Sequence, residues 1–223
     1  RSSQDLVTGQ EEAVMCKCHP NKRVVYGRFF NQTPPRNATI TVSAVPNTLD
    51  PKSPYVTSFL QALTIKQAFK ASTHEVFFPY TLHPPENDAL LVTLNFADSN
   101  LFGFYKSGLL AQDELQVLEF PELALMREHL KVTNPTLLDA RTTSLIIHNV
   151  QRFCIFDSQK YIAGKTLYGK NFHKASPEHI QQALTVVKKP QTATILPVLA
   201  PNVCIHPIYT PEIIESFLKD LIV

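Results

Sequence analysis

The feature that most constrains the fold is a near-continuous apolar run, ALLVTLNFA, at residues 89–97. A strand with one face in water alternates apolar and polar residues, whereas an unbroken apolar run is typical of a strand buried on both faces. The stretch TTSLIIHNVQRFCIF at 142–156 has the same character. Strands of this kind need covering layers, so the two runs indicate a sheet packed between other elements.

Helical and strand-like patterns alternate along the rest of the chain. β-branched alternation predicts strands, and apolar residues at helical spacing predict helices. The alternation favours an α/β fold with a mixed β-sheet flanked by helices on both faces. No change in composition marks a linker, so residues 1–223 are expected to form a single domain, in which residues 1–50 show the weakest pattern. The further strands are predicted at 38–45, 74–82 and 192–201, and the helices at 54–72, 112–120, from Pro121, at 177–189 and at 210–222.

Composition excludes several classes of protein. Hydrophobic residues make up 44% of the chain, which is enough for a sizeable core. The net charge of +2 comes with no basic stripe, so nucleic acid is not an expected partner. No apolar run reaches the roughly 18 residues of a membrane span. Four cysteines in a chain of this length do not make a disulfide scaffold, and the expected location is intracellular, cytoplasmic or nuclear.

Glycine is scarce, and four of the six glycines fall in two short stretches. Gly103 and Gly108 bound GFYKSG, and Gly164 and Gly169 bound GKTLYG. Glycine is needed where the backbone takes a positive φ or where another group comes very close to it. The two stretches therefore predict either ligand-binding loops or surface turns.

The loop after residue 97 is the expected position of a site, because ligands of open α/β sheets bind beyond the carboxyl ends of strands. This loop ends in Gln112-Asp113-Glu114, where a helix is predicted to begin. Acids in a first helical turn stabilise the helix by about 0.3–1 kcal/mol through its dipole. Two adjacent carboxyl groups are also the chemistry that cleaves a glycosidic bond, so both interpretations are open.

The residues 96–114, FADSNLFGFYKSGLLAQDE, resemble the signature region of poly(ADP-ribose) glycohydrolase, a member of the macrodomain superfamily. In that family a strand ends in Phe-Ala-Asn, a Gly-Gly-Gly loop follows, and Gln-Glu-Glu then opens a helix. Here Asp98 stands in place of the asparagine, and Phe102-Gly103-Phe104 stands in place of the three glycines. The segment YIAGKTLYG, at 161–169, is similar to the family's tyrosine-rich segment.

The resemblance implies a macrodomain-like fold and an ADP-ribosyl hydrolase. It places the catalytic acid on Glu114, with Asp113 and Asp98 orienting the ribose and a water molecule. The implied substrate is ADP-ribose attached to a protein side chain, with ADP-ribosyl-arginine as one candidate linkage. The partners are then ADP-ribose and ADP-ribosylated protein, and no cofactor is implied.

The remaining candidate residues are assigned to substrate binding. A side chain at either loop glycine, 103 or 108, is expected to obstruct the approach of the diphosphate to the backbone. Aromatic side chains, among them Phe172, are candidates for stacking on adenine, with a place in the core as the alternative. The amide of Asn202 is a candidate donor to ribose or phosphate, or a turn residue. The predicted binding residues are Phe96, Phe102, Gly103, Phe104, Gly108, Gln112, Tyr161, Tyr168 and Asn202.

No metal site is expected. The stretch CKCH places Cys16 and Cys18 only one residue apart, which is poor spacing for tetrahedral zinc. Three hypotheses remain: a hydrolase, a module that binds ADP-ribose without cleaving it, and a structural α/β domain without ligand. The acidic pair favours the first, whereas the replaced glycines favour the other two.

Overall fold

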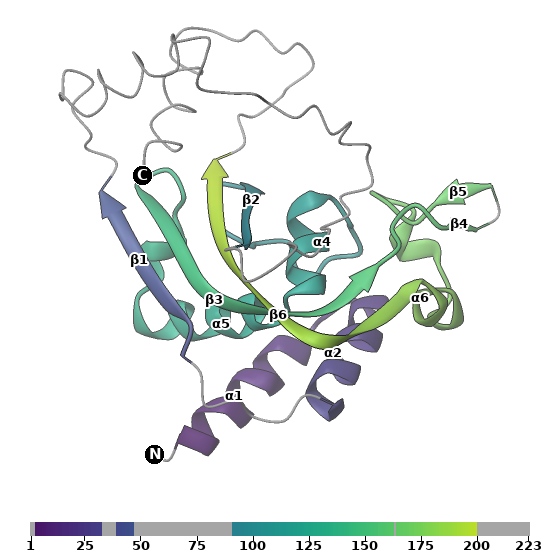
Figure 1. Cartoon of the computed structure of the whole chain (residues 1–223), viewed down its shortest axis with the longest axis horizontal. Coiled ribbons are helices and arrows are strands. Elements are labelled where there is room, and N and C mark those ends of the chain that lie inside the picture. The colour runs from purple at the N-terminus through teal and green to yellow at the C-terminus, as the bar shows by residue number, and fades with distance from the viewer. Residues whose placement is uncertain (1–2, 33–38, 47–90, 163, 200–223) are drawn as a thin grey trace, which may run out of the picture.

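The computed structural model of the chain describes residues 3–32, 39–46, 91–162 and 164–199 (Figure 1). The predicted helices at 54–72 and 210–222 and the predicted strand at 74–82 lie outside these residues, as does Asn202.

A mixed four-stranded sheet forms the centre of the described structure, as predicted. Its strand order is β1-β3-β6-β2, with β3 antiparallel to both β1 and β6 and with β2 parallel to β6. A small hairpin lies apart from the sheet. The strands are β1 (Thr41–Pro46), β2 (Leu91–Ala97), β3 (Thr143–Phe156) and β6 (Leu184–Leu199), and the hairpin is formed by β4 (Tyr161–Ile162) and β5 (Lys165–Thr166).

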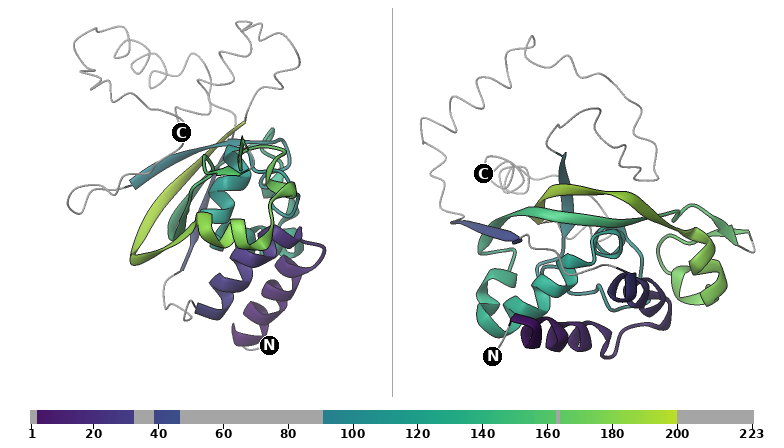
Figure 2. Two further views of the ribbon diagram at one scale, coloured as in Figure 1. Left: turned by 90° about the vertical axis from the view of Figure 1, so that its right-hand side faces the viewer. Right: turned by 60° about the horizontal axis from the view of Figure 1, so that its bottom comes forward.

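The described helices lie on one side of the sheet, as both views of Figure 2 show. Helix α4 packs on β2 and β3, α5 packs on β3, and the pair α1 and α2 forms an outer layer against α5 and α6. The expected helices on the second face are therefore not found in the described residues. The helices are α1 (Ser3–Met15), α2 (Pro20–Gln32), α4 (Gln112–Glu119), α5 (Glu122–Thr133) and α6 (Pro177–Ala183), with short 3₁₀ turns at Pro135–Leu138 and Phe172–Lys174. None of them is long and apolar enough to cross a membrane.

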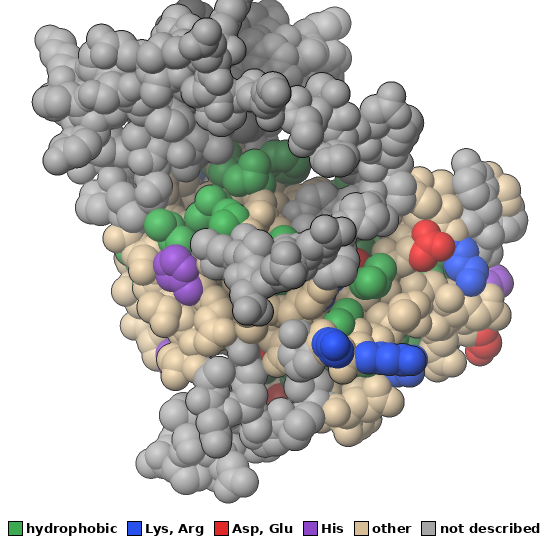
Figure 3. All heavy atoms as spheres, in the orientation of Figure 1, with side chains coloured by type: hydrophobic (Ala, Val, Ile, Leu, Met, Phe, Trp, Pro, Cys, Tyr) green, Lys and Arg blue, Asp and Glu red, His purple; other side chains and the backbone are tan. Residues whose placement is uncertain are grey.

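The prediction that the 89–97 strand is buried on both faces is wrong for its described part, β2. Thr93, Asn95 and Ala97 are buried against the helices, whereas the alternate side chains are exposed. Val92 is 47% exposed and Phe96 is 48% exposed. The reason is that the described helices cover only one face of β2, which is the last strand at one edge of the described sheet. Figure 3 shows hydrophobic side chains on the face of the molecule turned toward the viewer.

Element boundaries follow the sequence patterns closely around the predicted site. The helix predicted at 112–120 is α4, the helix predicted from Pro121 is α5, and the strand predicted at 142–156 is β3. The helix predicted at 177–189 is wrong beyond residue 183, because the chain continues as β6. Thr185 and Val186 favour a strand, and pairing with β3 supplies the partner that it needs.

A buried ion pair joins α4 to the sheet. The guanidinium of Arg152 on β3 donates from Nη2 to Oε2 of Glu119 over 2.7 Å, and both side chains are inaccessible to solvent or nearly so. The other carboxylate oxygen of Glu119 accepts from the backbone N–H of Phe156 over 2.8 Å. The carboxylate therefore ties the end of α4 to two positions on β3.

We predict that Arg152→Met lowers the free energy of unfolding by about 3–5 kcal/mol, because it leaves Glu119 buried without its cation. Arg152→Met combined with Glu119→Gln should recover part of that loss. The control is Arg141→Met, which breaks an exposed pair with Asp139 and should cost much less, because solvent screens that pair. Denaturant unfolding measures all three, and equal costs for the two single variants would contradict the prediction.

Candidate functional site

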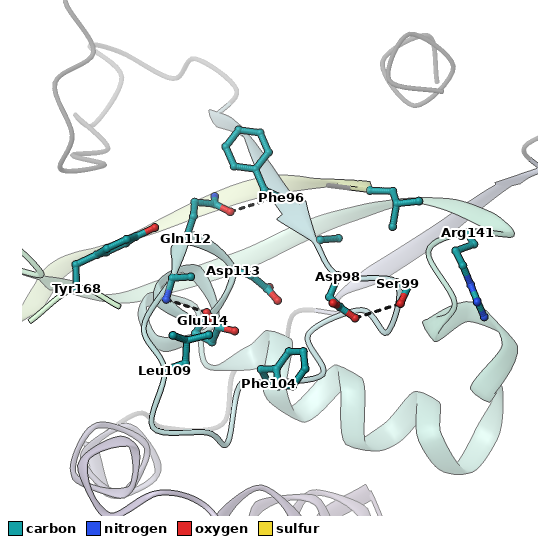
Figure 4. A pocket seen from close by; sticks show the side chains of 13 residues that line it. Phe96, Asp98, Ser99, Phe104, Leu109, Gln112, Asp113, Glu114, Arg141 and Tyr168 are labelled. Carbon is teal, nitrogen blue, oxygen red and sulfur yellow. Dashed lines mark hydrogen bonds between the residues drawn. The ribbon is translucent and has the colours of Figure 1, made fainter. Parts of the chain in front are cut away.

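A pocket of about 550 Å³ opens at the carboxyl end of β2, where the sequence predicted a site (Figure 4). Most of its wall comes from the loop after β2 and from the first turn of α4. Its volume falls within the range of pockets that bind small molecules. It is lined by Phe96, Ala97, Asp98, Ser99, Phe104, Leu109, Ala111, Gln112, Asp113, Glu114, Arg141, Tyr168 and Leu199.

The side-chain amide of Gln112 fixes α4 to β2. Its Oε1 accepts from the backbone N–H of Phe96 over 2.9 Å, and its Nε2 donates to the carbonyl of Leu94 over 2.9 Å. One turn later, Gln116 donates to the hydroxyl of Thr93 and to the same Leu94 carbonyl. Gln112, predicted to bind substrate, lines the pocket but uses both ends of its amide to position the helix.

Helix α5 holds the loop after β2. The guanidinium of Arg127 donates to the carbonyl of Leu101 and to the side-chain oxygen of Asn100. The hydroxyl of Tyr105 donates to Glu128 over 2.6 Å. The loop therefore reaches the first turn of α4 along a path determined by packing against α5.

Glu114 makes a hydrogen bond at the start of α4, in addition to being an acid in the first turn of that helix. Its Oε2 accepts from the backbone N–H of the N-cap residue Ala111 over 2.8 Å, which satisfies that N–H group at the start of α4. The side chain is 3% exposed and also lines the pocket. A capping role and a role in the pocket therefore coexist in one carboxyl group.

Asp113, the other acid of the pair, is buried and hydrogen-bonded. Its Oδ1 accepts from Nδ2 of Asn95 over 3.0 Å. Burial raises the pKa of Asp113 to about 7, and the nearby charges of Glu114 and Asp98 act in the same direction. The hydrogen bond from Asn95 and the charge of Lys22 oppose the increase in pKa. This carboxyl group can therefore carry a proton near neutral pH.

Asp98 lies across the pocket from the acid pair, as Figure 4 shows. Its Oδ1 accepts from the hydroxyl of Ser99 and from the backbone N–H of Asn100, so it begins the loop as a turn residue. The structure thus brings together Asp98, Asp113 and Glu114, the three predicted catalytic carboxyl groups, in one pocket.

Three of the predicted aromatic residues also line the pocket. These are Phe96, Phe104 and Tyr168, and Phe104 is 51% exposed. Burial raises the pKa of Tyr168, whereas a hydrogen bond with the backbone of Gln112 opposes that effect. The pocket therefore offers aromatic surface near its carboxyl groups.

Sequence reasoning did not identify Arg141 as a lining residue, whereas Ser99 and Leu109 belong to the loop that was expected to form the site. Arg141 brings a cation to the rim, where it also pairs with Asp139. It lies just before β3, far from the motif in sequence, and the antiparallel bridge between Asn100 and Asp139 brings it close. No local signal could have placed it there.

Several predicted binding residues lie elsewhere. Phe102 and Phe172 are fully buried in the core and do not line the pocket. Phe102 has a φ of 55°, so the loop keeps a left-handed residue where the resembled family has glycine. Tyr161 lies in β4, and Asn202 is outside the described residues.

The role predicted for the two loop glycines is not supported by their surroundings. A Cβ on Gly108 would lie 2.7 Å from the Cβ of His173, and one on Gly103 would lie 2.8 Å from the backbone oxygen of Asn100. Neither glycine lines the pocket. These positions therefore need glycine for packing within the protein, and a larger residue there would disturb folding first.

Within the described residues, no three His, Cys, Asp or Glu side chains are placed to hold a metal ion. Cys16 is exposed, and Cys18 and Cys154 are buried free thiols.

We predict that Gln112→Leu lowers the free energy of unfolding by about 1–3 kcal/mol, because it leaves the Phe96 N–H and the Leu94 carbonyl without their partner. The amide hydrogen of Phe96 should also exchange faster with solvent. Gln181→Leu on α6, at an exposed position, is the matched control and should change stability by less than about 0.5 kcal/mol. An unchanged exchange rate of the Phe96 amide hydrogen would show that the two hydrogen bonds of the Gln112 side chain do not hold this part of β2.

We also predict that Asp113→Asn stabilises the protein at pH 8 and has less effect at pH 5. Because burial raises the pKa of Asp113 from 3.8 to about 7, the folded protein holds a proton that the unfolded chain releases between these values. The contribution of Asp113 to stability is therefore complete below about pH 4 and is lost as pH rises through about 7. Asparagine removes this loss and can still accept from Asn95.

Thermal unfolding between pH 4 and 8 measures this difference. Glu178→Gln is the control, because a hydrogen bond with Ser176 lowers the pKa of that exposed acid. The contribution of Glu178 to stability therefore changes with pH in the opposite direction to that of Asp113. A constant difference in Tm between Asp113→Asn and the parent protein across this range would contradict the raised pKa.

Comparisons of the chain with protein-family models, with curated proteins and with solved structures find no match. The resemblance to the glycohydrolase signature rests on residues 96–114 and 161–169 alone, and the pocket has to be interpreted from its own chemistry.

Proposed function

We propose that the pocket binds ADP-ribose and that the protein hydrolyses the bond between ADP-ribose and a modified protein side chain. The observation that carries the proposal is the pair Asp113 and Glu114, two adjacent buried carboxyl groups facing one pocket. The resemblance of residues 96–114 supplies the substrate class. A helix start alone does not require Asp113 to be buried beside a second acid.

The two carboxyl groups suit different steps of glycosidic cleavage. With a pKa of about 7, Asp113 can donate a proton to the leaving nitrogen or oxygen as its bond to the anomeric carbon breaks. Water then adds to the anomeric carbon, and its proton passes to Glu114 or to solvent. In this proposal Asp113 takes the role of general acid that the resemblance assigns to Glu114. Glu114 accepts the hydrogen bond from the Ala111 N–H with one carboxylate oxygen, and the other oxygen can accept the proton.

The rest of the pocket provides groups that suit the remainder of the ligand. Phe96, Phe104 and Tyr168 offer aromatic surface for the adenine ring, and base stacking on such a side chain contributes about 1–3 kcal/mol. Arg141 at the rim suits the negatively charged diphosphate. Asp98 lies across the pocket from the acid pair, and its carboxylate suits ribose hydroxyl groups.

We predict that Asp113→Asn and Glu114→Gln each lower single-turnover release of ADP-ribose by about 10²-fold or more, the scale of general acid–base groups. Both substitutions keep shape and hydrogen bonding, so the affinity for ADP-ribose should change little. The activity of the parent protein should fall as pH rises through about 7, because Asp113 loses its proton there. This fall should be absent in Asp113→Asn and present in Glu114→Gln. Substrates with defined Arg, Ser and Glu linkages identify the bond that is cleaved.

Glu178→Gln is the matched control, because Glu178 also occupies the first turn of a helix but is exposed. Parent-like hydrolysis by Asp113→Asn and Glu114→Gln would remove the catalytic assignment. ADP-ribose binding without hydrolysis of any linkage would favour the non-catalytic binding module. A thermal shift assay that shows no stabilisation by millimolar ADP-ribose would contradict both ADP-ribose hypotheses and favour a structural domain without ligand.

A further inference from the structure

A buried lysine lies on α2, which packs against α4, the helix that carries the acid pair. Lys22 on α2 is fully buried, and within the described structure its ammonium nitrogen has no hydrogen-bond partner. That nitrogen lies 5.8 Å from the centre of the Phe172 ring. The neighbouring Asn21 donates to the carbonyls of Phe172 and Ala175, which fixes this turn of α2 in place.

A buried charge without a partner is costly, so its surroundings need an explanation. Burial lowers the pKa of Lys22 to about 8, and the charge of Glu114 is the largest influence that opposes this decrease. Cys18 and Asp113 act in the same direction as Glu114, and His19 is a further titratable neighbour. The titratable groups that interact electrostatically with Asp113 are Glu114, Lys22, Asp98, Tyr26 and Arg127.

We propose that Lys22 is a positioning residue that acts through the acid pair: its buried ammonium group stabilises negative charge on the pair, so that Asp113 exchanges its proton near neutral pH and does not hold it to higher pH. The part of this inference that concerns turnover rests on the proposed hydrolase function, whereas the electrostatic part does not.

The physical reason is the like charge of the two neighbouring carboxylates. Two adjacent buried carboxylates repel each other, so one of them tends to keep a proton. The charge of Lys22 opposes the effect of burial and limits the increase in the pKa of Asp113. The pair can then hold one acid and one base at neutral pH, which is the arrangement that glycosidic cleavage needs.

The test is Lys22→Met, which removes the charge and keeps an unbranched side chain in the same space. The carboxyl ¹³C signal of Asp113, assigned with Asp113→Asn, reports its ionisation without substrate. We expect its apparent pKa to rise by about half a pH unit or more when the cation is removed. The pH profile of single-turnover hydrolysis should move upward by a similar amount.

The matched control is Arg23→Met, the adjacent residue on α2, because it removes the same charge at an exposed position. It should leave the titration of Asp113 and the pH profile unchanged. Thermal unfolding checks that Lys22→Met and Arg23→Met are folded. Titration of Asp113 as in the parent, in a folded Lys22→Met protein, would overturn the proposal.

The coupling can also be measured from the lysine, which keeps the proposal testable if Lys22→Met does not fold. Glu114→Gln should lower the apparent pKa of the Lys22 ammonium group, followed by its ¹⁵N signal, and an unchanged value would overturn the proposal. A parent protein that hydrolyses no linkage would overturn the proposed function, but the two titrations would still decide the coupling of Lys22 to the pair.

Discussion

The contact on which the site depends is the junction between the end of β2 and the start of α4. Polar side chains on successive turns of the helix reach the strand: Gln112 bonds Leu94 and Phe96, Asp113 bonds Asn95, and Gln116 bonds Thr93. These bonds fix the rotation of α4 about its axis. That rotation determines that the acid pair faces the pocket.

The sequence was informative where one local rule decided the outcome. The strand ending at Ala97, the helix beginning at Gln112 and the second helix after Pro121 follow from an apolar run, first-turn acids and a proline, and all three are present. Around Leu184 two rules competed, because residues 177–189 satisfy a helical pattern while Thr185 and Val186 favour a strand. Pairing with β3 favours the strand from Leu184 onward, and such pairing cannot be deduced from one segment.

The site shows the same division between local and distant information. Asp98, Asp113 and Glu114 are near one another in sequence, and a single motif was enough to predict that they meet. Lys22 and Arg141 reach the region from α2 and from the segment before β3, through tertiary packing alone. The burial that raises the pKa of Asp113 is likewise a property of packing, so adjacency to Glu114 could suggest its direction but not its size.

The two hydrogen bonds between the Gln112 side chain and β2 have a consequence for association between molecules. An edge strand exposes backbone groups that can recruit a strand from another chain and so begin aggregation. On β2 the Phe96 N–H and the Leu94 carbonyl are already occupied by a side-chain amide. An incoming strand would have to displace that amide and release the start of α4. The contacts that build the pocket therefore also protect this edge of the sheet against intermolecular β-pairing.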